Sequence, residues 1–302
     1  MSKIPPSFKI ANIALFLCAQ LHWAKADESK LFIFWDTVSP DGKYALGWST
    51  SGSLDADDLV DETDTELKNG LVDVASRKML VVLPDAGYWH LPDGGHPNHY
   101  SMSTVWSDDS VSLLAIYDSR YATDQVYLLD VKTMRVKNLF DDLQSAFYQA
   151  VRDKAASYYR KYKKEYSLYF SGPWFVGHDR CELSGSTFVS KFDDNSVYFD
   201  LTLQFTSAAK LSSIKLEKVD DNSVESNDRR LNRAYRSLIG LLTSDERKAL
   251  VEEERAWIGQ RDAAQSAKAK NDLVAARIQT LNDRLDAKIS TLRSADAEKV
   301  AK

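Results

Sequence analysis

Three histidines within one glycine- and proline-rich stretch are the residues best suited to chemistry. The stretch covers residues 89–100 and holds His90, His96 and His99. Imidazoles gathered on a loop can bind zinc or copper, but a closed structural site needs four ligands, and no cysteine is near in the sequence. We therefore expect a surface loop without a bound metal, and its role stays open.

Two other stretches approach functional motifs without completing them. Residues 55–66 are rich in Asp and Glu, but an EF-hand loop needs glycine at its sixth position, where Val60 stands. A solvated acidic loop that attracts a cationic partner is the expectation. Gly47-Trp48-Ser49 begins like a nucleophile elbow but lacks the closing glycine. We expect no catalytic residue and no cofactor, and a hydrolase that uses the histidine loop is the less favoured alternative.

The charge is unevenly distributed along the chain. The 302 residues carry a net charge of −5, and residues 1–26 contain three Lys and no acidic residue, so without them the charge becomes −8. Residues 226–302 hold 16 basic and 12 acidic residues, or +4, which leaves −12 for residues 27–225. An acidic total of this kind disfavours nucleic-acid binding.

The first residues have the composition of a secretory signal peptide. Lys3 and Lys9 form a positive start, residues 10–21 are largely apolar, and residues 24–26 read Ala-Lys-Ala before Asp27. The apolar run is shorter than the roughly 20 residues that a membrane-spanning helix needs. We therefore expect residues 1–26 to be removed and the protein to be periplasmic or secreted, without a stable membrane anchor.

The first half of the chain reads as a β-meander that contains a repeat. A polar turn before a strand occurs at residues 39–43 and again at 106–110, and a hairpin follows each time, at 71–83 and 126–140. The recurrence resembles blades of a β-propeller. Two units, or three with residues 183–219, are fewer than the roughly four or more that close a ring. We expect an incomplete, propeller-like stack of antiparallel sheets with covered edges.

One helix and further strands follow the repeat. The pattern predicts a single amphipathic helix over residues 142–165. Its end, residues 158–166, alternates bases with aromatics, which indicates either a packed helix end or a surface for an anionic polymer or a membrane. Residues 220–228 are polar and predict an inter-domain linker. Strands are expected at residues 174–176, 186–192, 198–206 and 211–219.

The last quarter of the chain predicts three helices. Apolar residues recur at spacings of three and four over residues 231–242, which indicates one buried helical face. Thr243 and Glu246 form a capping box, so a second helix begins there. A third helix follows a cap at Asn271 or Asp272. The predicted class is therefore α+β, with an N-terminal antiparallel β-meander, one amphipathic helix and a C-terminal three-helix bundle.

Two motifs flank the capped turn between the first two of these helices. They read Leu-Asn-x-x-Tyr at residues 231–235 and Arg-Ala-Trp-Ile-x-x-Arg-Asp at residues 255–262. Their order resembles the helical domain of the lysozyme inhibitor LprI family. Many members of that family carry cysteines before the first helix and after the Arg-Asp pair, where this chain has Ala264 and Gln265. A disulfide of that kind is therefore absent from this chain.

The resemblance implies a protein partner, lysozyme, and a binding site made of motif residues. The candidate binding residues are Tyr235, Arg255, Trp257, Arg261 and Asp262. The same residues also fit a structural role, because Trp257 and Arg261 lie one helical turn apart and the guanidinium can cover the indole.

These observations favour an exported, non-enzymatic binding protein with two domains. A β-rich domain is expected over residues 27–220 and a helical domain over residues 226–296, and the resemblance implies lysozyme inhibition. The alternative is an envelope interaction or scaffold protein without inhibitory activity.

The signal-peptide assignment makes a prediction about processing. N-terminal sequencing of the protein recovered from the envelope of the producing cell is expected to start at or near Asp27, because cleavage follows the small residue Ala26. Intact Met1 on protein from a soluble cytosolic fraction would contradict the assignment.

Overall fold

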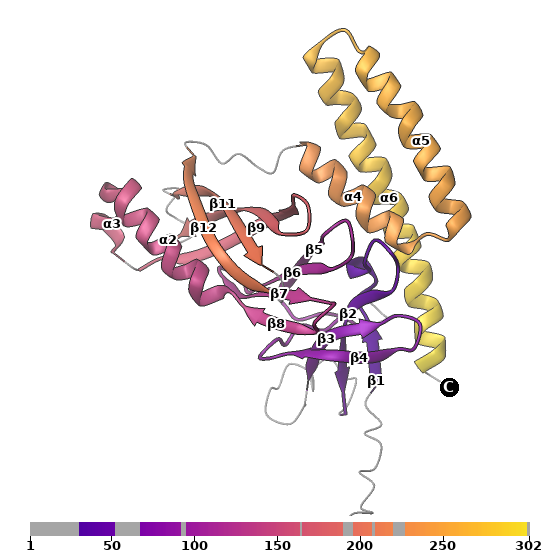
Figure 1. Ribbon diagram of the computed structural model, residues 1–302, viewed down its shortest axis with the longest axis horizontal. Helices are drawn as coiled ribbons and strands as arrows, with labels where there is room; N and C mark the ends of the chain where they lie inside the picture. The colour runs from indigo at the N-terminus through magenta and orange to yellow at the C-terminus, as the bar shows by residue number, and fades with distance from the viewer. Residues whose placement is uncertain are drawn as a thin grey trace, which may run out of the picture.

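The computed structural model describes most of the chain between residues 30 and 300. The described stretches are residues 30–51, 67–91, 95–163, 165–189, 196–206, 209–219 and 227–300. They contain three antiparallel four-stranded sheets and five α-helices, and the C-terminal part is helical (Figure 1). The predicted α+β class is confirmed. The predicted signal peptide, residues 1–26, and the acidic stretch, residues 55–66, lie outside the described residues.

The first two sheets are consecutive meanders, each with its strands in chain order. The first sheet consists of β1 (Lys30–Ile33), β2 (Tyr44–Thr50), β3 (Lys68–Asp73) and β4 (Lys78–Leu83). The second consists of β5 (Ser101–Trp106), β6 (Ser112–Asp118), β7 (Thr123–Asp130) and β8 (Arg135–Asn138). The sequence reading missed most of β5, because Ser-Met-Ser-Thr alternates too weakly in polarity to predict a strand.

The repeated turn has the same hydrogen bonds in both sheets. The Ser39 hydroxyl donates to Asp41 Oδ1 at 2.7 Å, and the Ser107 hydroxyl donates to Asp109 Oδ1 at 2.7 Å. In each turn the N–H of the following strand's first residue donates back to the serine hydroxyl, at 3.0 and 2.9 Å. The two turns also meet, since Asp41 N–H donates to Ser110 Oγ at 3.1 Å. The predicted sequence repeat is thus a repeat of local structure.

The hairpins that end the two sheets repeat in the same way. The Asp73 and Asp130 carboxylates each accept the backbone N–H three residues ahead, at 2.7 and 2.9 Å. The residue that follows each of these turns has a left-handed backbone conformation, with φ of 52° at both Arg77 and Met134. Side-chain acceptors of this kind close tight turns, which explains why aspartate ends both strands.

The third sheet consists of longer strands in the order β12-β11-β10-β9. The strands are β9 (Ser167–Phe175), β10 (Arg180–Phe188), β11 (Tyr198–Thr206) and β12 (Lys210–Val219). The predictions at residues 198–206 and 211–219 are close to β11 and β12, but those at 174–176 and 186–192 misplace β9 and β10. The misplacement has a cause in β10, where Ser-Gly-Ser at residues 184–186 reads like a turn. Gly185 is instead an inward position that leaves room for Phe147.

Two helices cover the third sheet where the sequence predicted one over residues 142–165. They are α2 (Phe140–Lys154) and α3 (Ala156–Tyr162), and the chain bends between them at Ala155, with φ −137° and ψ 48°. No proline or glycine lies at the bend, so we attribute it to the packing of the neighbouring side chains against the sheet. The Tyr158 and Tyr166 rings, 5.5 Å apart, are both buried against the sheet. The packed-end interpretation of residues 158–166 is consistent with this burial.

The sheets stack so that the second is covered on both faces. Residues that alternate along its strands belong to two different cores, because successive side chains of a strand point to opposite faces. Leu113, Ala115, Tyr127 and Leu129 pack with the first sheet, whereas Leu114, Ile116, Val126 and Leu128 pack with the third sheet and α2.

The three C-terminal helices are α4 (Asn227–Leu241), α5 (Ser244–Ala263) and α6 (Ala267–Val300). The capping box is confirmed, since Glu246 N–H donates to Thr243 Oγ1 at 3.4 Å and Thr243 N–H donates to Glu246 Oε2 at 2.7 Å. The predicted start of the third helix at Asn271 or Asp272 is wrong. Helix α6 begins earlier because the Ser266 hydroxyl accepts the Ala269 N–H at 3.1 Å and caps it.

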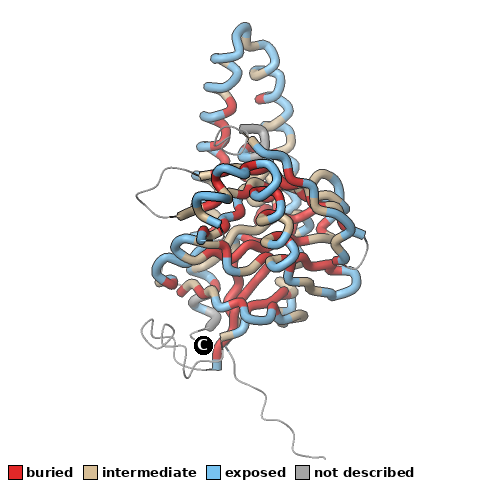
Figure 2. The backbone as a smooth tube through the Cα atoms, turned by 90° about the vertical axis from the view of Figure 1, so that its left-hand side faces the viewer, coloured by how far each residue is buried: buried red, intermediate tan, exposed pale blue. Residues whose placement is uncertain are grey.

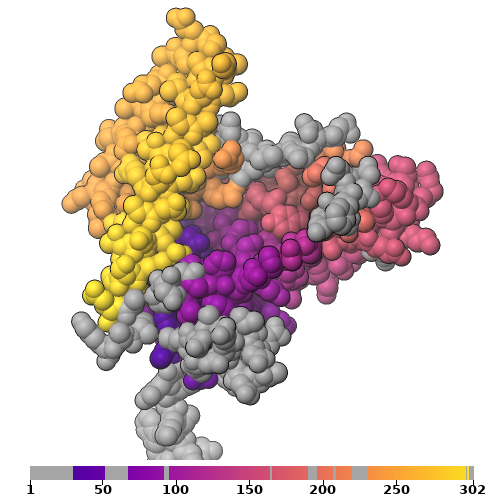
Figure 3. Space-filling view, turned by 180° about the vertical axis from the view of Figure 1, so that it is seen from behind, coloured from indigo at the N-terminus to yellow at the C-terminus, as the bar shows by residue number. Residues whose placement is uncertain are grey.

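Helix α6 runs through two different surroundings. Its first part lies beside α5 in a hairpin that projects from the β-rich body (Figures 1 and 2). Its second part lies along the first sheet (Figure 3). There Ile289 packs with Leu241 of α4 and with Ile33, Ala45 and Val72 of the first sheet. The helices are thus packed against the β-rich part as well as against each other.

Replacement of glycine by alanine is expected to change stability in opposite directions at Gly185 and Gly259. At Gly185 a Cβ would lie 2.6 Å from Phe147 and 2.9 Å from Leu201, so Gly185→Ala is expected to destabilise by about 1–3 kcal/mol. At Gly259, inside α5, a Cβ would meet nothing within 4 Å, so Gly259→Ala is expected to stabilise by about 0.8–1 kcal/mol. Urea midpoints measure both changes, and equal shifts would contradict the packing described.

Candidate functional site

The candidate binding residues divide into a buried and an exposed set. Trp257 of α5 is 9% exposed and belongs to the core shared by α4, α5 and α6. Tyr235 of α4 packs against the same core, and burial raises the pKa of its hydroxyl. These two side chains hold the helices together and present little surface to a partner.

Arg261 covers the indole that it was expected to cover. Its guanidinium lies 5.4 Å from the centre of the Trp257 ring, and its Nη2 is 2.9 Å from Asp262 Oδ1. A contact of this kind contributes about 0.5–1 kcal/mol at a partly exposed site. Arg261 therefore seals the outer edge of the helical core.

The opposite face of α5 forms an exposed stripe of Arg255, Ile258, Gly259 and Asp262, here called the α5 stripe. Positions three, four and seven residues apart lie on one side of a helix. Ile258 is 41% exposed, and the space around Gly259 is open. Sequence reasoning missed Ile258, although its place between Trp257 and Gly259 was visible, because a lone apolar residue on a helix is assigned to the core by default.

Ion pairs lock α5 to α6 on the inner side of the hairpin. Arg277 is only 8% exposed in its side chain and lies 2.6 Å from Glu253 Oε1 and 2.5 Å from Glu254 Oε1. Arg284 meets the second oxygen of Glu253 at 2.8 Å. Hydrogen bonds and positive charge from Arg277 and Arg284 outweigh the burial of Glu253, so its pKa falls below the usual value.

A further pair extends this lock to the start of α5. Lys288 Nζ is 3.0 Å from Glu246 Oε1. The Thr243 backbone N–H donates to the Glu246 carboxylate, and with Lys288 it lowers the pKa of Glu246 to about 2. The carboxylate therefore stays ionised in any mildly acidic medium, and the hairpin keeps this contact there.

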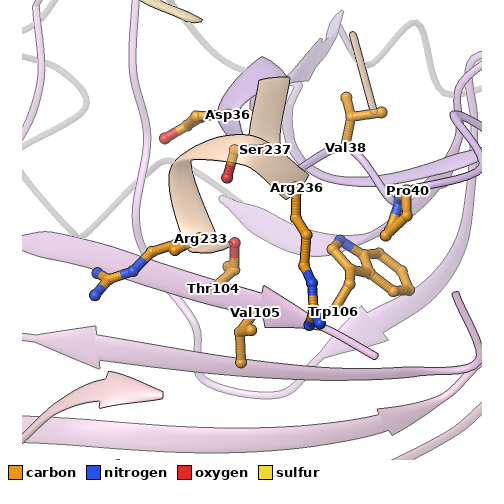
Figure 4. Close-up of a pocket in the computed structure, with 9 residues that line it drawn as sticks. All are labelled: Asp36, Val38, Pro40, Thr104, Val105, Trp106, Arg233, Arg236 and Ser237. Atoms are coloured by element: carbon orange, nitrogen blue, oxygen red, sulfur yellow. The ribbon is translucent and has the colours of Figure 1, made fainter. Parts of the chain in front are cut away.

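Helix α4 joins the hairpin to the β-rich body through Arg236. Its guanidinium lies 2.6 Å from Asp108 Oδ1 of the second repeated turn and 4.2 Å from the centre of the Trp174 ring. Figure 4 shows the Arg236 side chain of α4 beside Trp106 of β5, and both line a small cavity together with Ser237. The cavity measures about 20 Å³, room for one water molecule, so it is a joint between helix and sheet.

The end of α4 lies directly against the first repeated turn. A Cβ on Gly240 would lie 2.8 Å from the Ser39 carbonyl oxygen, closer than a side chain tolerates. Arg247, from the first turn of α5, donates to the carbonyls of Leu242 and Gly240 at 2.9 and 3.4 Å. At the far end of α6, Asp296 pairs with Arg77 of the β3–β4 turn.

The histidines do not assemble into a metal site. His90 Nδ1 donates to the Leu91 carbonyl at 2.8 Å, and its ring centre is 6.1 Å from that of His96. Burial and the positive charge of Arg293 lower the pKa of His90. His99 takes a left-handed turn conformation, with φ of 67°. Within the described ranges no group of three or more His, Cys, Asp or Glu residues is placed to hold a metal ion.

The remaining residues considered as functional candidates are part of the protein core. Gly47, Trp48 and Ser49 lie inside strand β2, where Trp48 is fully buried, so this segment is a core strand and forms no nucleophile elbow. The side chain of Cys181, in β10 of the third sheet, is buried, and its Sγ lies 3.7 Å from the Glu182 carbonyl oxygen. Across the described helices, none combines the length and apolar character that a membrane span requires.

Comparison with known protein families matches residues 207–294 to the family described as Lysozyme inhibitor LprI. The matched segment contains α4, α5 and most of α6, together with the last strand of the third sheet. This match supports the resemblance found in the sequence motifs. Searches of curated proteins and of solved structures gave no match, so no neighbour confirms the propeller likeness of the N-terminal part.

Neighbouring residues of α5 predict very different costs of truncation. Trp257→Ala is expected to destabilise by about 3–5 kcal/mol, because it empties the core between three helices. Ile258→Ala, at a site 41% exposed, is expected to change stability by no more than about 0.5 kcal/mol. Chemical denaturation followed by helical circular dichroism measures both. Similar losses for the two variants would show that the α5 stripe is not a free surface.

Proposed function

We propose that this protein is an exported, non-enzymatic lysozyme-binding protein that inhibits by covering the enzyme's cleft with the α5–α6 hairpin. One observation carries the proposal: the segment that matches the lysozyme inhibitor family contains a hairpin that projects from the body and exposes the α5 stripe. In this arrangement residues 226–296 act as the inhibitory module, and residues 27–220 carry it.

The α5 stripe has the chemistry of a small recognition surface. Ile258 supplies an exposed apolar centre, and Arg255 and Asp262 flank it with opposite charges. Arg255 pairs with Glu252 of its own helix, at 2.6 Å, and both side chains are about 70% exposed. Weak solvent-exposed pairs of this kind open readily to meet a partner. Trp257, Tyr235 and Arg261 support the stripe from inside.

The charge of the chain favours capture of a basic enzyme by the whole protein. The helical segment from residue 226 is mildly basic, at +4, whereas residues 27–225 carry −12. Animal lysozymes typically present basic surfaces, so the β-rich part attracts the enzyme toward the hairpin. Binding is therefore expected to weaken as salt rises, because screening reduces attraction between exposed charges.

An envelope scaffold that shares only the helical fold is the second candidate. The packing of α4 and α6 on the first sheet supports this candidate, because helices that are fixed to the body can also have a purely structural role. Lysozyme binding by the mature protein separates the two functions.

Substitution in the α5 stripe tests the proposal. Ile258→Asp is expected to weaken lysozyme binding and inhibition of cell-wall lysis by at least about tenfold, or about 1.4 kcal/mol. Met134→Asp is the matched control, because Met134 lies in the β7–β8 turn and is 40% exposed, against 41% for Ile258. It is expected to leave both readouts within about twofold.

Calorimetric titration and a lysis assay with the full mature chain give the two readouts. No binding to any lysozyme tested would remove the inhibitor function and leave the scaffold. Binding that Ile258→Asp leaves unchanged would place the contact surface outside the hairpin.

A further inference from the structure

A cavity of about 510 Å³ lies at the end of the second sheet where β6 ends and β7 begins. The connection between β4 and β5 forms its other wall. Its volume is within the range of sites that hold small organic ligands. Its walls combine aromatic, acidic and polar side chains with a few small or aliphatic residues. The aromatic and polar ones include Tyr88, Trp89, Tyr100, Tyr117, Asp85, Asp118, Asp124 and Gln125, and the aliphatic ones are Leu67, Ala86 and Pro97.

The aromatic rings that line the cavity have faces that attract cations. Tyr100 is 51% exposed, whereas Tyr117 is only 6% exposed, and both side chains line the cavity. The Tyr117 hydroxyl is buried and has no hydrogen-bond partner among the described residues. A buried hydroxyl without a partner is costly and therefore points to a polar ligand group nearby.

Three carboxylates line the same cavity, and among the described residues no Lys or Arg lines it. Asp118 is 5% exposed, and its carboxylate accepts the Thr123 hydroxyl at 2.6 Å. Asp124 accepts the Ser119 hydroxyl at 3.0 Å. Over the described part of the chain, Asp85, Asp118 and Asp124 take part in no ion pair. Their negative charge is left for a ligand to balance.

The pKa of Asp118 reflects chiefly the burial of its carboxyl group. Burial raises its pKa to about 6, and the neighbouring charge of Asp124 adds to the rise, while the hydrogen bond from Thr123 opposes it. Burial also raises the pKa of Asp124, and Tyr169 of β9 faces Asp118 with a hydroxyl of raised pKa. A cation bound between these groups would stabilise their charged forms.

A compact metal ion does not fit this arrangement. Metal ions need several ligand atoms gathered around one point, and no such group of acidic residues is present in the described segments. Acidic groups spread along a cavity suit a ligand that carries several charges spaced along a chain. The aromatic walls suit the methylene groups between those charges.

From this arrangement we propose that the cavity binds a small linear polyamine, with its ammonium groups on Asp118, Asp124 and Asp85 and its methylene chain against Tyr100 and Tyr117. This binding does not depend on the proposed lysozyme contact, which lies on α5. The carboxylates supply charge-assisted hydrogen bonds, and the tyrosine faces add cation–π attraction.

Titration calorimetry of the full mature protein with spermidine tests the proposal. Asp118→Asn keeps the side-chain shape and removes the charge, and it is expected to weaken spermidine binding at least about tenfold. Tyr100→Ala is a second variant at an exposed site and is expected to weaken binding at least about threefold. Asp153→Asn on α2, also exposed, removes the same charge away from the cavity and is the matched control.

The pH dependence provides an independent readout. Spermidine binding is expected to be strong above the Asp118 pKa of about 6 and to fall below it, because protonation removes the charge that the ligand needs. In Asp118→Asn that fall is expected to be reduced.

Three results would overturn the proposal. The first is no spermidine binding at low salt above the pKa of Asp118. The second is equal weakening by Asp153→Asn and Asp118→Asn, which would indicate non-specific attraction to an acidic surface. The third is equal binding of Mg²⁺ and spermidine, which would indicate a site that recognises charge alone.

Discussion

The close approach of Gly240 to the Ser39 carbonyl is the contact on which the position of the helical part depends. At this point α4 ends against the first repeated turn, and a side chain of any size would hold the two apart. Arg247 then closes the helix end by donating to two of its carbonyls. With α4 fixed here, Leu241 and Ile289 bury against the outer face of the first sheet. The direction in which α5 and α6 leave the body follows from this docking.

The repeated turn therefore has a second use beyond closing a hairpin. In the first sheet it provides the surface that receives α4, and in the second sheet its Asp108 receives Arg236. The two turns touch each other through Asp41 and Ser110, so one helix contacts both copies at once. A duplicated local structure has become a platform for an element outside the repeat.

Local signals in the sequence predicted well, and distant packing did not. The capping box depends on two residues three positions apart, Thr243 and Glu246, and was predictable, as were the alternating strands β11 and β12. The bend at Ala155 and the inward Gly185 depend on tyrosines and on Phe147 brought in from elsewhere, so no local pattern reveals them. The site shows the same division. The sequence found the motif around Trp257, but the acidic cavity combines Asp85, Asp118 and Asp124 from separate segments and was missed.

Helix α6 fixes both the distance and the rotation between the first sheet and the far end of the hairpin, because it is one continuous helix. Its 34 residues form one uninterrupted helix, roughly 50 Å long at 1.5 Å per residue. A single residue inserted midway would turn everything beyond it by about 100°, whereas three or four would nearly restore the facing. The orientation of the hairpin end relative to the body can therefore change only in steps set by the helical period. Homologous chains with hairpins of different length are constrained to vary by whole turns if the same face is to stay outward.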